Sequence, residues 1–312
     1  MRGYEALRES AAWFELDGRT VFRVAGQDSV RWLHAMVTNH IAGLEPGHGC
    51  YAFLLNAQGR ILADVNILRL SDHFLLDLEP AVRQAIFAHL DKHIIADDVV
   101  LEDWSDRLVV IAVEGPRSAE ALEGMGLPAP GTQFAHQQHE ALLVARVSAT
   151  GLPGFRIFAA AAMRETLHER IVRSGVPEAD QEAVRTVRLE QGRPRYGEDI
   201  TDQRLPHETQ LLHAVHFNKG CYLGQEIVER VRTRGQVHRL LVRLAVEGQG
   251  ALPAGVRIMS GGQEVGEITS AAWSPALGRI VALGYVRREE LESAGALEAA
   301  GHKVSVLSQP PA

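Results

Sequence analysis

Cysteine is scarce in this sequence, which limits the redox and metal chemistry that one chain can carry. Only Cys50 and Cys221 occur among its 312 residues. Two cysteines cannot form a disulfide framework, and they cannot supply a tetrahedral four-thiolate zinc site. Cys50 directly precedes the apolar segment YAFLL, so we expect it to lie in a hydrophobic core.

Long apolar runs and a surplus of basic charge are also missing. No stretch of about 18 consecutive apolar residues occurs, so no transmembrane helix and no membrane partner are expected. The N-terminal segment carries acidic residues where a secretory signal would be apolar, which favours a cytoplasmic address. The formal net charge of −7 argues against a general nucleic-acid binder.

Histidine is present, but its pattern is not typical of a metal site. The spacing of His207, His213 and His216 matches no compact pair of ligands on a regular helix. Any further ligands would have to come from distant parts of the chain. We therefore predict no metal-binding site.

The first part of the chain mixes strand and helix patterns. Its length suggests two or three cores rather than one. The sequence predicts strands at 51–55, 61–70 and 74–78, and helices at about 30–37 and 81–93. A second unit of similar content follows, with predicted strands at 108–113, 141–148 and 155–159, and helices at 117–125, 162–173 and 178–191. Such strand meanders with inserted helices favour an α+β architecture over a doubly wound parallel sheet.

The composition changes near Gly235, where the helix signal becomes sparse. Short strand candidates separated by glycine and proline follow, in the order HRLLVRLAV, VRIMSGG, QEVGEITSAAW, GRIVALGYV and KVSVL. This pattern is typical of a small antiparallel β-barrel, here with one short helix near 288–293. We therefore divide the chain into 1–235, with subdomains of about 1–105 and 106–235, and a barrel domain of 236–312.

The segment KGCYLGQE, which begins at Lys219, carries the second cysteine. Glycines at 220 and 224 permit close backbone approach to Cys221. The ammonium of Lys219, together with the positive end of a helix that starts downstream, could stabilise a thiolate. The alternative is that Cys221 is a small buried hydrophobic residue, as free cysteines commonly are.

This octapeptide resembles the signature K-G-C-[FY]-x-G-Q-E of the YgfZ family, which is related to the glycine-cleavage T-protein. Two further segments are similar to the same superfamily. RLEQGRPRYGEDI resembles the RLEAG-x-x-x-YG segment of T-proteins, and HAMVTNHI with YAFLLNAQGRILADV resembles their N-terminal region. The resemblance extends from about Val24 to the terminal barrel. It implies a T-protein-like three-domain ring with ferredoxin-like α+β units, a C-terminal antiparallel β-barrel, and tetrahydrofolate bound in a central channel.

The resemblance also implies roles for individual residues. Glu190 stands where the T-protein glutamate binds the pterin ring, and a carboxylate can accept two donors from that edge. Tyr196 would line the same pocket, or else only anchor its loop. Lys219 lies near the place of a basic residue that faces the folate, and it could pair with the glutamate tail of the cofactor or with Cys221. Arg232 alternates with two other arginines in ERVRTRG, and these would share one side of an extended segment. They could meet a polyglutamate tail or a partner, or form a solvated face.

Asp64 is the position where the sequence departs from the T-protein pattern. T-proteins have an adjacent Asp pair in the strand after the Gly-rich turn, whereas this chain has Ala63 followed by Asp64. This difference puts the transferase mechanism in doubt. Asp64 could still face the reactive nitrogens of the folate as a weak acid or base, or it could be a polar residue on an open strand face.

These features together lead to one main functional hypothesis and two alternatives. The main hypothesis is a tetrahydrofolate-binding accessory protein for assembly or repair of iron–sulfur enzymes, with iron–sulfur client or assembly proteins as partners and Cys221 as the working thiol. The first alternative is a folate-dependent aminomethyltransferase or a related demethylase. The second is a folate-storing scaffold in which Cys221 is merely packed.

Overall fold

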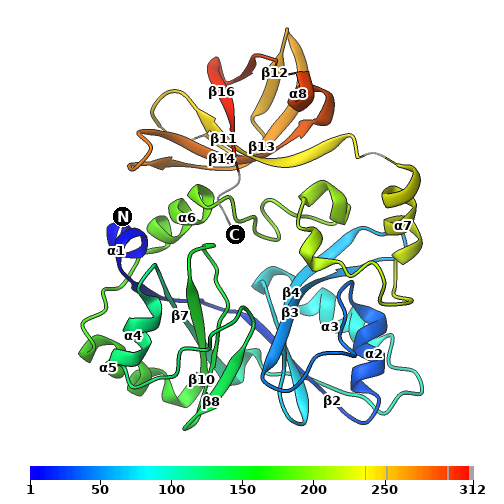
Figure 1. Cartoon of the computed structure of the whole chain (residues 1–312), viewed down its shortest axis with the longest axis vertical. Helices are drawn as coiled ribbons and strands as arrows, with labels where there is room; N and C mark the ends of the chain where they lie inside the picture. The colour runs from blue at the N-terminus through cyan, green and yellow to red at the C-terminus, as the bar shows by residue number, and fades with distance from the viewer. Residues whose placement is uncertain (236, 251, 294, 309–312) are drawn as a thin grey trace.

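The computed structural model describes residues 1–235, 237–250, 252–293 and 295–308. These residues form two five-stranded antiparallel sheets and one closed antiparallel barrel, which confirms the predicted α+β class. Figure 1 shows the two sheets side by side at one end of the molecule and the barrel at the other. None of the helices in this described part is both long and apolar enough to cross a bilayer.

The first sheet has the strand order β3-β4-β5-β2-β6. Its elements and the helices between them are β2 (Thr20–Ala25), α2 (Ser29–Met36), β3 (His48–Leu55), β4 (Ile61–Arg69), β5 (His73–Leu78), η1 (Pro80–Val82), α3 (Arg83–Asp91) and β6 (Val100–Asp103). The predicted strands and helices of this region are confirmed by β3, β4, β5, α2 and α3. Strands β2 and β6 were not predicted, and β6 is a four-residue edge strand without a buried face.

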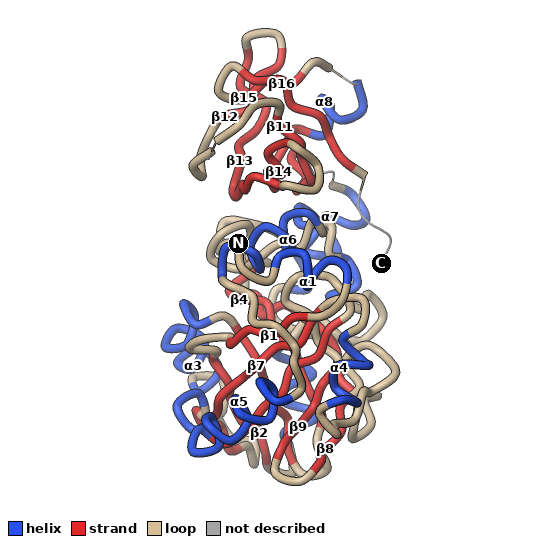
Figure 2. The backbone as a smooth tube through the Cα atoms, turned by 90° about the vertical axis from the view of Figure 1, so that its left-hand side faces the viewer, coloured by secondary structure: helices blue, strands red, loops and turns tan. Residues whose placement is uncertain are grey.

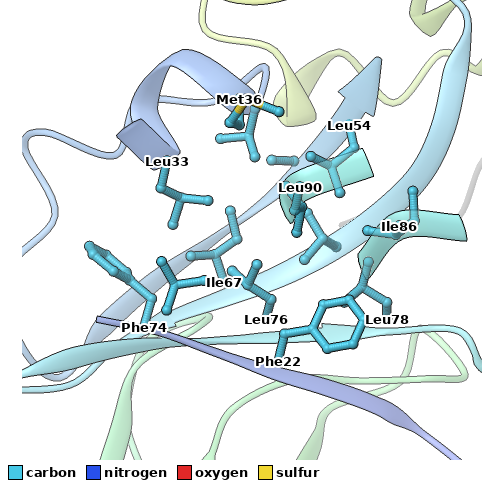
Figure 3. Packing of buried hydrophobic residues seen from close by; sticks show 14 of the residues in the cluster. Phe22, Leu33, Met36, Leu54, Ile67, Phe74, Leu76, Leu78, Ile86 and Leu90 are labelled. Atoms are coloured by element: carbon cyan, nitrogen blue, oxygen red, sulfur yellow. The ribbon is translucent and has the colours of Figure 1, made fainter. Parts of the chain in front are cut away.

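The core of this unit lies where α2 and α3 cover one face of the sheet. Phe22, Ile67 and Leu76 from the strands meet Leu33 of α2 and Ile86 of α3, and none of these is more than 2% exposed (Figure 3). Because side chains alternate along a strand, the odd-numbered residues 63, 65 and 67 of β4 enter this core. The even-numbered residues of β4 therefore face the opposite side of the sheet.

The second sheet has the order β1-β7-β10-β9-β8. Its elements and helices are β1 (Ala12–Glu15), η2 (Ser105–Arg107), β7 (Leu108–Glu114), α4 (Ser118–Gly124), β8 (His136–His139), β9 (Leu142–Ala145), β10 (Gly154–Ala160), η3 (Ala161–Met163) and α5 (Arg164–Arg173). The expected subdomain of about 1–105 is not contiguous in the sheets, because β1 pairs with β7 and so belongs to the second sheet. The buried aromatic side chains of Trp13 and Phe14 account for this, since they complete the core of the second unit.

The C-terminal domain is a closed six-stranded barrel with the order β11-β14-β13-β12-β15-β16. Pairing of β11 with β16 closes it. Its elements are β11 (Arg239–Val246), β12 (Arg257–Ser260), β13 (Gln263–Ser274), β14 (Arg279–Arg287), α8 (Arg288–Ser293), β15 (Leu297–Ala299) and β16 (His302–Leu307). The sequence predicted five of these strands. It missed β15, whose three residues are too short to show alternation.

Helices lie between the barrel and the sheets, as the turned view shows (Figure 2). They are α1 (Tyr4–Glu9), α6 (Gln181–Glu190) and α7 (Gln225–Arg234), with the short turns η4 (Pro206–Thr209) and η5 (Leu212–Ala214). Helix α6 starts at the cap Asp180, whose carboxylate accepts a 2.8 Å hydrogen bond from the N–H of Ala183. It packs against α1 on one side and against β13 and β14 of the barrel on another.

Candidate functional site

A cavity of about 340 Å³ is lined by both sheets, by helix α6 and by the loop that follows α6. Strand β3 contributes Tyr51, β4 contributes Asp64 and Asn66, β10 contributes Arg156, and α6 contributes Arg188. The β3–β4 register pairs Tyr51 with Asn66, which places these side chains on the same side of the sheet. The cavity therefore forms on the sheet face opposite to the α2–α3 core.

Asp64 has an unusual environment inside this cavity. The hydroxyl of Tyr51 donates a 2.8 Å hydrogen bond to Oδ2 of Asp64. Burial and the nearby charge of Glu79 raise the pKa of the Asp64 carboxyl above its ordinary value. Burial and the charge of Asp64 raise the pKa of Tyr51 well above 10, so that its hydroxyl keeps its proton and stays a donor. This carboxyl can hold or release a proton closer to neutral pH than an exposed aspartate can.

A buried ionic cluster lies beside Asp64. Asp77 is 1% exposed, and it accepts hydrogen bonds from Nε of Arg19 at 2.7 Å, from Nδ2 of Asn66 at 3.2 Å and from Nη1 of Arg156. Two polar atoms of these cavity-lining side chains, Oδ1 of Asn66 and Nε of Arg156, are buried and have no hydrogen-bond partner among the residues that the structure describes. Unpaired buried polar atoms are costly, so these two atoms are candidates for pairing with a ligand that offers one donor and one acceptor.

Most other charged groups of the lining are already paired. Although burial alone would raise the pKa of Glu79, the guanidinium groups of Arg19 and Arg195 lower it to about 2. Arg188 binds Asp199 at 2.6 Å and Glu198 at 2.6 Å. Asp199 in turn accepts hydroxyl hydrogen bonds from residues 269 and 270 of β13, which ties this side of the cavity to the barrel.

Glu190, which the resemblance assigned to the pterin ring, lies outside the cavity lining. It is 5% exposed, and its carboxylate accepts hydrogen bonds from the hydroxyl of Tyr4 and from Oγ of Ser274 at 2.5 Å. Nε of Arg8 lies 3.3 Å from its other oxygen. Glu190 thus joins α1, α6 and the barrel through both of its carboxylate oxygens.

Tyr196 also contacts other residues of the chain and lies outside the cavity lining. Its hydroxyl donates a 3.3 Å hydrogen bond to the carbonyl of Ile61, and its ring packs beside Ile200 in an apolar cluster. Burial raises its pKa to about 12. Of the two alternatives considered for Tyr196, this geometry favours the loop anchor.

Lys219 is buried, and its side chain binds the C-terminal end of α2. Its Nζ donates hydrogen bonds to the carbonyl of Val37 at 2.6 Å and to the carbonyl of His34. Nε2 of His34 lies 2.8 Å from the carbonyl of Lys219, so the contact is reciprocal. Burial lowers the pKa of Lys219 to about 8. The thiol that interacts electrostatically with its ammonium is that of Cys50, which opposes this lowering. The ammonium anchors the KGCYLGQE loop and does not face the cavity.

The two cysteines differ sharply in accessibility. Cys221 is exposed on the loop that leads into α7, outside the cavity lining. Cys50 is partly buried in the first core, and burial raises its pKa to about 12. A reagent or partner protein could therefore reach Cys221 without entering the cavity.

The arginines after the octapeptide lie on a helix, because α7 extends over Gln225–Arg234 (Figure 1). The condition under which the arginines would share one side, an extended segment, is therefore not met, and the helix expected to start downstream of Cys221 is present. Arg232 stacks on Phe217, with 4.9 Å from Cζ to the ring centroid, and binds Glu229 at 3.0 Å. It does not line the cavity.

The three histidines of the linking segment occupy different surroundings. His207 packs near Phe217, His213 stacks on Tyr51, and His216 contacts His40. Within residues 1–235, 237–250, 252–293 and 295–308, no group of three or more His, Cys, Asp or Glu side chains is placed to hold a metal ion.

Two domain families match the sequence and together span most of it. The GCVT N-terminal domain matches residues 1–219, and the glycine cleavage T-protein C-terminal barrel domain matches residues 239–310. The chain belongs to the glycine-cleavage T-protein family.

Relatives of known name agree with this assignment. The chain is 32% identical over 296 residues to an aminomethyltransferase of Rubrobacter xylanophilus, covering 92% of this chain and 78% of the relative. It is 30% identical over 297 residues to an aminomethyltransferase of a Picosynechococcus species, covering 92% and 81%. The crystal structure of the glycine cleavage system aminomethyltransferase T from Bartonella henselae superposes with a TM-score of 0.88 at 26% identity, covering 98% of this chain and 88% of that one.

Membership in the T-protein family confirms the fold expected from the resemblance, namely α+β domains followed by a closed antiparallel barrel. Tetrahydrofolate is the cofactor that this fold binds, which confirms the cofactor expectation for the family. The family match does not separate a YgfZ-type member from an aminomethyltransferase, and the similar proteins of known name carry the latter name.

The cavity also contains residues that the sequence reasoning missed. Tyr51, Asn66 and Arg156 line the cavity, and Arg193 extends over the ring of Tyr51. Tyr51 and Asn66 could have been found by aligning β3 with β4, since both belong to strands that were predicted. Arg156 had no such signal, because its partner Asp77 comes from a different sheet.

Proposed function

We propose that the chain binds a reduced folate in the cavity between its sheets and acts there on a one-carbon unit, as a folate-dependent aminomethyltransferase or a close relative of one. The observation that carries this proposal is the place of Asp64. Of the residues singled out from sequence, it is the one that lines the cavity, and its pKa is raised toward the range useful for proton transfer.

The lining suits the pterin end of a folate in size and in polarity. A volume of about 340 Å³ is at the lower end of the range of about 300–1,000 Å³ for small-molecule sites. The free Oδ1 of Asn66 can accept a hydrogen bond, and the free Nε of Arg156 can donate one. A heterocycle with N–H and C=O groups offers the complementary donor and acceptor. Tyr51 belongs to the same lining and presents its hydroxyl to Asp64, while His213 and Arg193 lie against its ring.

The protein groups have separate tasks in this proposal. Tetrahydrofolate, when bound, supplies the nitrogen atoms that take up the one-carbon unit. Asp64 holds or accepts a proton at its carboxylate oxygens, and Tyr51 orients the carboxyl through the 2.8 Å hydrogen bond. Asn66 and Arg156 fix the ligand edge, and α6 with its following loop forms one wall of the cavity.

The experiment compares the wild type with Asp64→Asn. We expect tetrahydrofolate, measured by calorimetry without oxygen, to bind both proteins within about threefold. Formation of methylenetetrahydrofolate from an aminomethyl-loaded lipoyl carrier should fall by about 10²-fold or more in Asp64→Asn. Absence of folate binding by the wild type would exclude the proposal, and equal turnover by both proteins would remove Asp64 from it.

A second candidate function is supported by the exposed thiol of Cys221 on the KGCYLGQE loop. In this reading, the chain is a folate-binding accessory protein of the YgfZ type, and Cys221 meets iron–sulfur client or assembly proteins at the surface. The position of the thiol outside the cavity makes the two candidates separable. Cys221→Ala should retain folate binding, and Asp64→Asn should retain the thiol.

Cells that lack the chain and are supplied with either variant would distinguish the two functions. If Cys221→Ala fails to restore the activity of iron–sulfur enzymes whereas Asp64→Asn restores it, the accessory function is favoured. If iron–sulfur enzyme activities do not change on losing the whole chain, the accessory function is excluded and the transferase proposal stands by itself.

A further inference from the structure

Six arginines line the cavity, and one of them differs from the rest. A carboxylate lies within ion-pair distance of each of five, which are Arg19, Arg156, Arg185, Arg188 and Arg195. Arg193 has no carboxylate partner and donates no side-chain hydrogen bond within the part of the chain that the structure describes. A guanidinium offers five N–H donors, so Arg193 is the arginine of this lining whose donors remain available to an anionic ligand.

The backbone holds Arg193 firmly in place. Its N–H donates a 3.0 Å hydrogen bond to the carbonyl of Arg188, and its own carbonyl accepts one of 2.9 Å from Nη1 of Arg188. Gly192, with φ of 65°, ends α6 in the left-handed conformation, and Pro194 restricts the chain directly after Arg193. The residue therefore starts from a rigid position at the negative end of a helix, which favours a cation there.

The side chain of Arg193 extends over Tyr51, with 5.3 Å from Cζ to the ring centroid. This contact orients the guanidinium but leaves its N–H donors free, because an aromatic face does not accept the in-plane hydrogen bonds that a guanidinium donates. The hydroxyl of the same Tyr51 binds Asp64. Tyr51 therefore contacts both groups. Its ring carries the Arg193 guanidinium, and its hydroxyl binds the Asp64 carboxyl that is proposed for proton transfer.

We propose that Arg193 is the carboxylate-recognition residue of this cavity. A ligand would present a carboxylate to the Arg193 guanidinium as a bidentate pair while its reacting nitrogen lies toward Asp64. This inference rests on the proposed function, since it assigns the ligand class of the same cavity. The carboxylate has two possible sources, which are the glutamate end of a folate and the carboxylate of a small amino acid such as an N-methylated glycine.

The test uses two matched variants, Arg193→Gln and Arg232→Gln. Each removes one arginine that stacks on an aromatic ring, on Tyr51 or on Phe217, but only Arg193 lines the cavity. A third variant, Arg193→Lys, keeps the charge but loses the planar fork. Thermal unfolding of each variant establishes that the comparison is made between folded proteins.

Binding is measured by calorimetry with two pairs of probes, each differing by a carboxylate. The first pair is tetrahydrofolate and tetrahydropteroate, which lacks the glutamate. The second pair is sarcosine and dimethylamine, added to the protein with saturating tetrahydropteroate and also without it. We expect Arg193→Gln to bind the relevant carboxylate probe about tenfold or more weakly, and its carboxylate-free counterpart as the wild type does. Arg193→Lys should be intermediate, and Arg232→Gln should match the wild type.

If Arg193→Gln weakens the binding of tetrahydrofolate but not of tetrahydropteroate, the carboxylate belongs to the folate. If it weakens the binding of sarcosine but not of dimethylamine, the carboxylate belongs to an amino acid. The inference is overturned if the wild type binds neither carboxylate probe, or if Arg193→Gln binds both as tightly as the wild type. Failure of the proposed function looks different, because then no folate or pteroate binds the wild type. Sarcosine binding that depends on Arg193 would in that case still support the inference.

Discussion

Ala63 and Asp64 point to opposite sides of β4. Ala63 is fully buried in the core beneath α2 and α3, whereas Asp64 lines the cavity. An acidic residue at position 63 would therefore face the apolar core, and alanine there removes no carboxylate from the cavity. The departure from the T-protein Asp pair, which on sequence alone counted against transfer chemistry, does not alter the groups around Asp64.

This alternation leads to a prediction for Ala63→Asp. Restoring the acidic pair should not increase turnover, because the new carboxylate enters the apolar core. It should lower the free energy of unfolding by about 3 kcal/mol or more, since a buried carboxylate has no partner there. Urea unfolding and turnover of the same protein measure both effects. A stable and more active Ala63→Asp protein would show that position 63 reaches the cavity.

Tyr51→Phe tests the hydrogen bond to Asp64. The Tyr51 hydroxyl lowers the pKa of Asp64, against burial and Glu79, which raise it. Its removal should raise that pKa further, so the acidic limb of the pH profile of kcat/KM should move to higher pH. The ring remains to hold Arg193, so carboxylate affinity should change little. An unshifted acidic limb with lower activity would mean that Asp64 does not govern the profile.

The raised pKa of Asp64 should also affect how the free energy of unfolding depends on pH. Because the folded-state pKa of Asp64 is raised, its protonation stabilises the fold below the ordinary carboxyl pKa, and this contribution is lost as pH rises through the raised pKa. Asp64→Asn resembles the protonated form. From about pH 4 to about pH 7, it should lose less stability than the wild type in urea unfolding. Parallel pH dependences of the two proteins would contradict the raised pKa.

Lys219→Met tests whether the lysine anchors the octapeptide loop. It leaves the carbonyls of His34 and Val37 without their donor, so we expect a loss of about 1–3 kcal/mol near neutral pH. The lysine pKa is lowered to about 8, so wild-type stability should rise, relative to Lys219→Met, between about pH 8 and the unfolded pKa of about 10.4.

The rate of alkylation of Cys221 provides the control for Lys219. If the lysine only anchors the loop, the pH dependence of Cys221 alkylation should be the same in the wild type and in Lys219→Met. Cys50 should react far more slowly than Cys221 in both folded proteins, because it is partly buried and its pKa is raised to about 12. If the alkylation profile of Cys221 lies at higher pH in Lys219→Met than in the wild type, Lys219 does stabilise the thiolate, as the sequence suggested.

Glu190→Ala separates a structural tie from a folate ligand. Three donors, on Tyr4, Ser274 and Arg8, lose their acceptor, which should lower the free energy of unfolding by about 2–4 kcal/mol. Folate affinity should stay within about twofold at temperatures where the protein remains folded. Glu190→Gln keeps one acceptor oxygen and should lose less stability. A tenfold loss of folate affinity without loss of stability would support the pterin role implied by the resemblance.

The sequence by itself determined the local elements and the family. Strand alternation, the turn after β3 and the glycine-rich spacing of the barrel depend on neighbouring residues, so β3 to β5 and most barrel strands could be predicted. The octapeptide and the RLEQG segment identified the superfamily. The short strands β6 and β15 were not predicted, because three or four residues are too few to show the alternation of buried and exposed side chains.

Only the tertiary structure decided which side chains share the cavity. Asp64 meets Tyr51 across a strand pair, Arg156 reaches Asp77 from another sheet, and Glu190 is turned away to hold α1 and the barrel. Lys219, two residues from Cys221 in sequence, binds the end of α2 instead. Such choices depend on the relative orientation of packed elements and on competition for buried partners, and spacing along the chain encodes neither.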